Sequence, residues 1–116
     1  MICVIEDDEA VRNSTGVLLE ALGYRFVAFD SAEAFLAAGA IETDCLILDH
    51  RLQIISGMDL LELLRARGVQ TPAIIISDAS NHLAARAARA GVTAMLRKPL
   101  AADALAQWLE EIFKHA

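Results

Sequence analysis

The stretch ICVIEDDE, residues 2–9, joins an unbroken apolar run directly to an acidic one. A continuous apolar run of this length, without alternation, is typical of a strand that is buried on both faces of a sheet. A second stretch, CLILD at residues 45–49, repeats the arrangement with one carboxylate. These stretches predict parallel strands whose carboxyl ends carry acidic side chains.

Further apolar runs follow along the chain, and helical patterns lie between them. The five expected strands are Ile2–Ile5, Arg25–Phe29, Cys45–Leu48, Ala73–Ile76 and Ala94–Leu96. The expected helices are a first with Val11, Leu18, Leu19 and Leu22 on its inner face, ending at Gly23; a second after Asp30 and Ser31; a third from about Gly57 to before Gly68; a fourth over Asn81–Ala90; and a last over about Ala101–Lys114.

Local signals add detail to three of these helices. Asp30 and Ser31 can cap the second helix, and Glu33 is placed to complete a capping box with Asp30. The fourth is rich in alanine and weakly amphipathic. The last carries an apolar stripe that includes Trp108, which we expect in the core.

Five strands that alternate with five helices predict an α/β fold with helices on both faces of a parallel sheet. Right-handed crossovers leave few arrangements, of which a flavodoxin-like, doubly wound sheet in the order 2-1-3-4-5 suits this length. We expect residues 1–116 to form a single domain, with no effector domain in this chain.

Composition narrows the possible functions. The chain has 116 residues and a net charge of −6, with 56% hydrophobic and 22% charged residues, which excludes disorder. The acidic balance argues against direct nucleic-acid binding. The longest charge-free stretches, such as Gly68–Ser77, are shorter than the ~18–20 apolar residues of a membrane span. Cys3 and Cys45 read as buried, reduced thiols, so we expect a cytoplasmic protein without a structural zinc site.

Polar residues gather where the predicted strands end. Their positions are Glu6 to Glu9 after the first strand, Asp49 after the third, Ser77 and Asp78 after the fourth, and Lys98 with Pro99 after the fifth. Each has a simpler interpretation: acidic residues favour a helix N-terminus, an aspartate starts a turn, and Lys-Pro ends a strand. Their joint occurrence favours a site, because ligands bind at the carboxyl ends of parallel strands.

The chemistry of such a site follows from its charges. Carboxylates held close together repel one another unless a cation lies between them, and oxygen ligands with few protein donors suit Mg²⁺. A carboxylate beside Mg²⁺ and a lysine can attack a phosphoryl group. A hydroxyl at the next strand end can then bind the new phosphoryl oxygens. The pattern predicts an aspartyl-phosphate switch.

With these residues at these positions, the chain resembles the receiver domain of two-component response regulators, most of all those of FixJ-type transcription regulators. The resemblance runs from VIEDDEAVR, residues 4–12, to the last helix. Its spacing is specific: 42 residues separate Asp7 from Asp49, 28 separate Asp49 from Ser77, and 49 separate Asp49 from Lys98.

The resemblance implies roles for individual residues. Asp49 would be the phosphoacceptor, and Asp7 and Asp49 would bind Mg²⁺ directly. The acidic pair would be Glu6 and Asp7, not Asp7 and Asp8, because Arg12 lies five residues after the metal-ligating aspartate and fixes the register. Glu6 would bind the metal through a water molecule. The backbone carbonyl of Arg51 would be a further metal ligand.

The remaining roles concern the response to phosphorylation. Ser77 would be the switch hydroxyl, Lys98 would pair with the phosphoryl group, and Gly57 would open the third helix. The family's aromatic switch position is here Met95.

Several residues depart from the family pattern. Met95 has no ring or hydroxyl, and Gln53 replaces the usual proline in the loop after the phosphoacceptor. Ile54 and Ile55 place apolar surface near the site. Asp78 adds a carboxylate beside the incoming phosphoryl group, which costs electrostatic energy.

The sequence is compatible with one leading hypothesis for the function and with two alternatives. The leading hypothesis is a receiver that a histidine kinase or phosphotransfer protein phosphorylates at Asp49, and that then dimerises or changes partners to control transcription. The first alternative is a degenerate receiver that binds partners without phosphorylation. The second, a small-molecule enzyme, lacks a glycine-rich phosphate loop and has Arg51 where an aspartyl phosphatase would have a second aspartate. We expect no turnover beyond the protein's own phosphorylation and dephosphorylation.

Overall fold

The computed structural model describes residues 1–39, 42–78 and 81–114, and in this part five strands alternate with helices. The elements are β1 (Ile2–Ile5), α1 (Glu9–Ala21), β2 (Phe26–Phe29), α2 (Ala32–Ala37), β3 (Cys45–Asp49), α3 (Gly57–Ala66), β4 (Ala73–Ser77), a 3₁₀ turn (Asn81–Leu83), α4 (Ala84–Arg89), β5 (Ala94–Arg97) and α5 (Ala102–Lys114).

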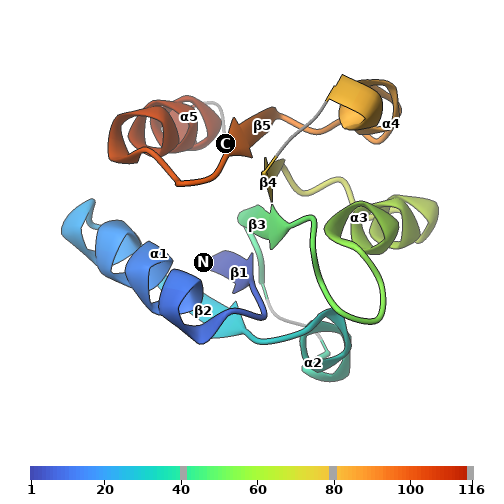
Figure 1. The fold of residues 1–116 in the computed structure, drawn as a ribbon, viewed down its shortest axis with the longest axis horizontal. Helices are drawn as coiled ribbons and strands as arrows, with labels where there is room; N and C mark the ends of the chain where they lie inside the picture. Colours follow the sequence, from blue (N-terminus) through green and yellow to red (C-terminus); the bar gives the residue numbers. More distant parts are fainter. Residues whose placement is uncertain (40–41, 79–80, 115–116) are drawn as a thin grey trace.

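The strands form one parallel sheet in the order β2-β1-β3-β4-β5. Helices α1 and α5 cover one face of the sheet, and α2, α3 and α4 cover the other (Figure 1). This is the predicted doubly wound, flavodoxin-like architecture. It places the ends of β1, β3, β4 and β5 along one edge, because all strands run in the same direction.

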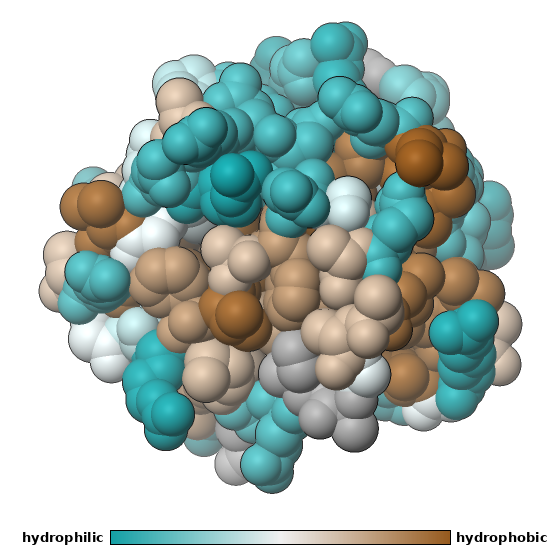
Figure 2. Space-filling view, turned by 90° about the horizontal axis from the view of Figure 1, so that it is seen from below, coloured by the Kyte–Doolittle hydropathy of each residue, from teal (hydrophilic) through white to brown (hydrophobic). Residues whose placement is uncertain are grey.

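The core has two halves, one on each face of the sheet. One half joins the sheet to α2, α3 and α4, and the other joins it to α1 and α5. β1, β3 and β4 are buried along their whole length, whereas edge strand β2 is half-buried. Seen from the side of β2, the surface carries apolar side chains across its middle, and many hydrophilic side chains lie above them in the view (Figure 2). None of the described helices has the length and apolar character that a membrane span requires.

The inner face of α1 differs from the predicted one. Thr15, Gly16 and Leu19 are buried, whereas Leu22 is 38% exposed. The reason is Gly16: an added Cβ there would lie 2.8 Å from the ring of Phe26. The absence of a side chain lets this turn of α1 lie close to the ring of Phe26, so the buried face of the helix runs through this position.

Two helix starts also differ from expectation. Ser31, rather than Asp30, caps α2, and its hydroxyl accepts a hydrogen bond from the backbone N–H of Ala34. The predicted box between Asp30 and Glu33 is therefore wrong. The predicted fourth helix divides into the 3₁₀ turn and the shorter α4, whose start has no side-chain cap.

The stripe on α5 is confirmed except at one position. Leu105, Leu109 and Ile112 are buried, but Trp108 is 38% exposed. Positions 105, 109 and 112 lie on one line of a helix with 3.6 residues per turn, and position 108 lies at the margin of that line. Trp108 therefore borders the core instead of filling it.

The start of α3 at Gly57 is as predicted, and the structure gives its physical reason. Ser56 and Asp59 form a capping box around the first turn. A Cβ on Gly57 would lie 2.3 Å from the backbone oxygen of Asp49 and 3.1 Å from the Cα of His50. Backbone atoms cannot rotate out of the way, so this contact requires glycine.

We therefore predict that Gly57→Ala lowers the free energy of unfolding by ~1–3 kcal/mol, because the methyl group displaces the backbone that carries Asp49. Urea denaturation measures the change. Gly16→Ala is the matched control, since its methyl group meets only the ring of Phe26, which can move, and alanine favours the helix by ~1 kcal/mol. Equal losses in the two variants would contradict this explanation.

Candidate functional site

Three carboxyl groups meet at the carboxyl ends of β1 and β3. Glu6, Asp7 and Asp49 each offer an oxygen, and these oxygens all lie within 4.8 Å of one another. Glu6 is 3% exposed and Asp49 is 2% exposed, whereas Asp7 is half-buried. The sheet order explains the meeting, because β1 and β3 are neighbours although 42 residues separate Asp7 from Asp49.

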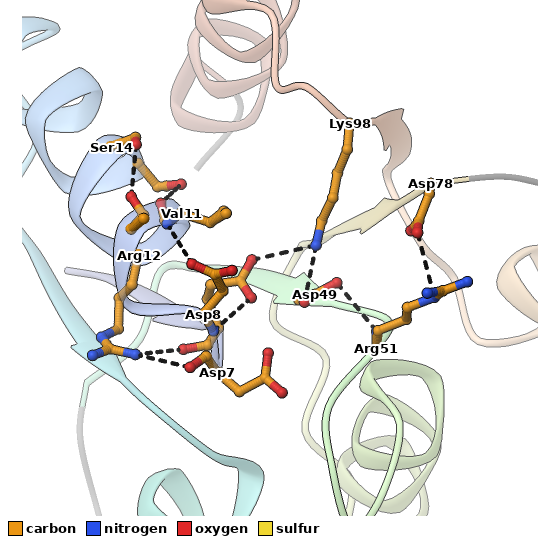
Figure 3. Close-up of polar contacts among 12 residues, drawn as sticks. Asp7, Asp8, Val11, Arg12, Ser14, Asp49, Arg51, Asp78 and Lys98 are labelled. Atoms are coloured by element: carbon orange, nitrogen blue, oxygen red, sulfur yellow. Dashed lines mark hydrogen bonds and ion pairs between the residues drawn. The ribbon is translucent and has the colours of Figure 1, made fainter.

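The acidic residues in the loop between β1 and α1 have two different roles. The Nη1 of Arg12 donates hydrogen bonds to the backbone oxygens of Glu6 (3.0 Å) and Asp7 (3.5 Å) (Figure 3). Asp8 caps α1 and accepts a hydrogen bond from the backbone N–H of Val11. Glu6 and Asp7 thus belong to the carboxylate cluster, whereas Asp8 serves the helix.

Lys98 supplies the positive charge of the site. Its Nζ lies 3.2 Å from Oδ2 of Asp49 and 3.7 Å from Oε1 of Glu6. Burial acts to lower the pKa of Lys98, but the hydrogen bond to Asp49 and the nearby negative charges outweigh it and raise the pKa. The lysine is therefore a fixed cation that faces two buried carboxyl groups.

One lysine does not fully offset the cluster. Burial, followed by the neighbouring Asp49 carboxyl, raises the pKa of Glu6 to about 8. A raised pKa means that the ionised form of Glu6 is destabilised, so additional positive charge would stabilise the ionised carboxylates of the site. A divalent cation with oxygen ligands can supply this charge, and Glu6, Asp7 and Asp49 are the side chains that could hold Mg²⁺.

The neighbouring strand ends complete the edge. Ser77 is buried at the end of β4, and its backbone oxygen accepts a hydrogen bond of 3.1 Å from the N–H of Lys98. The backbone N–H of Arg51 donates to Oδ1 of Asp49 at 3.1 Å. All predicted site residues thus lie at this edge except Met95, which is half-buried within β5 and packs on the core.

The side chain of Arg51 has a partner that was not predicted from its sequence position. Its Nε lies 3.4 Å from Oδ2 of Asp78, so the loops after β3 and β4 are joined across the outer side of the site (Figure 3). Asp78, which looked like an uncompensated charge, therefore has a cationic neighbour. The sequence does contain a signal for this ion pair, because Arg51 and Asp78 have opposite charges and follow two adjacent strands. The exposed Ile54 lies in the same loop as Arg51, as the sequence indicated.

The raised pKa of Glu6 predicts how Mg²⁺ binding depends on pH. Below about pH 8, Mg²⁺ must displace a proton from Glu6 when it binds. Its Kd should therefore fall by up to about tenfold for each unit of rising pH, and should level off above about pH 8. Isothermal titration calorimetry measures the change. Glu6→Gln is the control, since it cannot release the proton and should show a nearly flat profile. A flat profile in the wild type would contradict the assignment.

The chain is similar in sequence to known proteins. It matches the response regulator receiver domain over residues 2–110. It is 40% identical to the transcriptional regulatory protein FixJ of Azorhizobium caulinodans, over 83% of this chain and 46% of that protein. It is 32% identical to FixJ of Bradyrhizobium diazoefficiens, over 99% of this chain and 57% of that protein. The chain therefore spans about half the length of these relatives.

Solved structures agree with this match. The crystal structure of FixJ-N superposes with a TM-score of 0.88 at 29% identity and covers 99% of this chain and 94% of that one. A receiver protein from Pseudoalteromonas atlantica superposes with a TM-score of 0.90 at 26% identity, covering 98% and 97%. Receiver domains are signalling modules, not enzymes, and are partners of histidine kinases. Sequence match, sheet order and acidic cluster agree, and the chain belongs to the family of response regulator receiver domains.

Proposed function

We propose that the chain is a phosphorylation-driven receiver in which Asp49 accepts a phosphoryl group from a histidine kinase or phosphotransfer protein. A carboxylate oxygen of Asp49 forms the new O–P bond, the N–P bond of the phosphohistidine breaks, and its electron pair returns to the imidazole. The observation that carries the proposal is the setting of Asp49: a buried carboxylate 3.2 Å from Lys98, inside a carboxylate cluster.

The other site residues have supporting roles in this proposal. Lys98 forms an ion pair with the Asp49 carboxylate before phosphorylation and with the phosphoryl oxygens after it. The Ser77 hydroxyl donates a hydrogen bond to one of these phosphoryl oxygens. Asp7, Asp49 and the backbone carbonyl of Arg51 would hold Mg²⁺, and Glu6 would act through a water molecule. The ion would supply positive charge that screens the repulsion between these carboxylates and the phosphoryl oxygens.

The output is proposed to be a changed protein-binding face. The added negative charge draws Ser77 toward the phosphoryl group and biases the position of α4 and of Met95 beside it. The altered face then forms a homodimer or binds another partner. Because the FixJ relatives are named transcriptional regulatory proteins, we place this receiver in the control of transcription.

Phosphorylation is tested with a small donor, which removes the need to know the kinase. Incubation with acetyl phosphate and Mg²⁺ should add one phosphoryl group to the wild type, because the site itself activates Asp49. Intact-protein mass spectrometry measures the gain, and size-exclusion chromatography with light scattering shows whether the product dimerises.

Two controls make the result specific. Asp49→Asn keeps the shape of the side chain but removes the nucleophile, so it should gain no mass. Omission of Mg²⁺ should slow the gain in the wild type. A wild type that binds Mg²⁺ but is phosphorylated by neither acetyl phosphate nor a kinase would favour a receiver that acts without phosphorylation.

Asp78 is expected to slow phosphorylation, because its charge repels an anionic donor and occupies Arg51. Asp78→Asn should therefore raise the initial rate with acetyl phosphate by about two- to tenfold at low salt, and less at high salt. Glu20→Gln removes the same charge from an exposed position of α1 and serves as the control. Equal rates in Asp78→Asn and wild type would show that Asp78 does not influence the donor.

A further inference from the structure

Helix α4 is held by few apolar contacts. It has six residues, AARAAR, and its start has no side-chain hydrogen bond. Within it only Ala87 is buried, flanked by the buried Leu83 and Ala90. By contrast, α3 buries Met58 and three leucines. Alanine methyl groups bury little apolar area, so polar contacts have a large share in fixing the position of α4.

Arg86 makes ion pairs with two carboxylates of α3. Its Nη2 lies 3.0 Å from Oδ1 of Asp59 and 2.6 Å from Oε1 of Glu62, and its Nε donates to Oε2 of Glu62 at 3.1 Å. Asp59 and Glu62 are three residues apart on α3, so they point to the same side of that helix. One guanidinium thus joins α4 to two positions about one turn apart on α3, which lies next to it on the same face of the sheet (Figure 1).

The opposite end of α4 is tied in a different way. Arg65 of α3 donates from Nε to the backbone oxygen of Ala90 at 2.7 Å, and from Nη1 to the oxygen of Val69 at 2.9 Å. Ala90 is the residue directly after α4, whereas Val69 lies in the loop between α3 and β4. The C-terminal end of α4 is therefore held through a backbone oxygen that accepts a hydrogen bond from Arg65, whereas its first turn is held by the charge pairs of Arg86.

Asp59 links the Arg86 contact to the phosphorylation site. Its Oδ2 accepts a hydrogen bond from the backbone N–H of Ser56 at 3.2 Å, while its Oδ1 faces Arg86. Ser56 closes the loop that begins after Asp49, and the next residue, Gly57, packs directly on the backbone oxygen of Asp49. A shift of this loop thus changes the geometry of the same carboxylate that holds α4.

We propose that Arg86, with Asp59 and Glu62, is a latch that holds the first turn of α4 on α3 in the unmodified protein, and that Asp59 couples this latch to the loop after Asp49. The coupling rests on the function proposed above, whereas the latch itself does not. A latch present only in the unmodified state opposes the modified state, and its removal must therefore favour ligands that bind the modified state.

The latch is tested on the unmodified full chain by hydrogen–deuterium exchange. Arg86→Gln should speed exchange in a peptide spanning residues 84–92 by about three- to tenfold, because it removes the paired charges. Arg89→Gln removes the same charge from an exposed position of α4 and should change exchange much less, because Arg89 acts on Glu62 only as a weaker, additional charge. Glu62→Gln keeps the contact between Arg86 and Asp59 and should give an intermediate rate. Equal exchange in Arg86→Gln and Arg89→Gln would overturn the latch.

Salt provides an independent measurement without a mutation. The Debye length falls to about 3 Å in 1 M salt, so the partly exposed pairs are screened. Sodium chloride at that concentration should speed exchange of residues 84–92 in the wild type, but not in Arg86→Gln. Equal effects of salt on the two proteins would contradict a latch made of charge pairs.

The coupling is tested with beryllofluoride and Mg²⁺, which together mimic a phosphoryl group on an aspartate. Arg86→Gln should bind beryllofluoride about three- to tenfold more tightly than wild type or Arg89→Gln. Faster exchange with unchanged beryllofluoride affinity would overturn the coupling while leaving the latch. Absence of beryllofluoride binding and of phosphorylation in the wild type would instead refute the proposed function, and the exchange data would still decide the latch.

Discussion

The confinement of two buried carboxyl groups, Glu6 and Asp49, beside a single lysine is the interaction on which the site depends. Both side chains are nearly inaccessible, and Lys98 lies 3.2 Å from one and 3.7 Å from the other. Burial strengthens both the repulsion between the carboxyl groups and their attraction to the lysine. The raised pKa of Glu6 is the direct consequence, and it explains why the site fits a divalent cation.

The backbone around this cluster is fixed by contacts that leave little freedom. Arg12 binds the backbone oxygens after β1, and Gly57 packs on the backbone oxygen of Asp49. These contacts hold the carboxylates on adjacent strands close together although they repel one another. The cost of that repulsion is offset by the buried sheet, whose three central strands are inaccessible along their length and apolar up to the site residues Asp49 and Ser77 that end β3 and β4.

The helices around the sheet are held by different forces. α3 and α5 bury leucine side chains, which make many contacts that no single charge can release. The first turn of α4 depends instead on Arg86 and two carboxylates, and ion pairs respond to salt and to local charge. A signalling domain needs a stable frame and an element that can be displaced, and this division of forces provides both.

The sequence by itself determined the sheet, the order of its elements and the residues at its carboxyl edge. Those features depend on local signals: continuous apolar runs for buried strands, and polar residues directly after them. Only the tertiary structure decided which of Asp30 and Ser31 caps α2, where Trp108 lies, and how Arg51 and Arg86 are paired. Arg86 and Glu62 are 24 residues apart and follow no period, so only the packing of α4 against α3 brings them together.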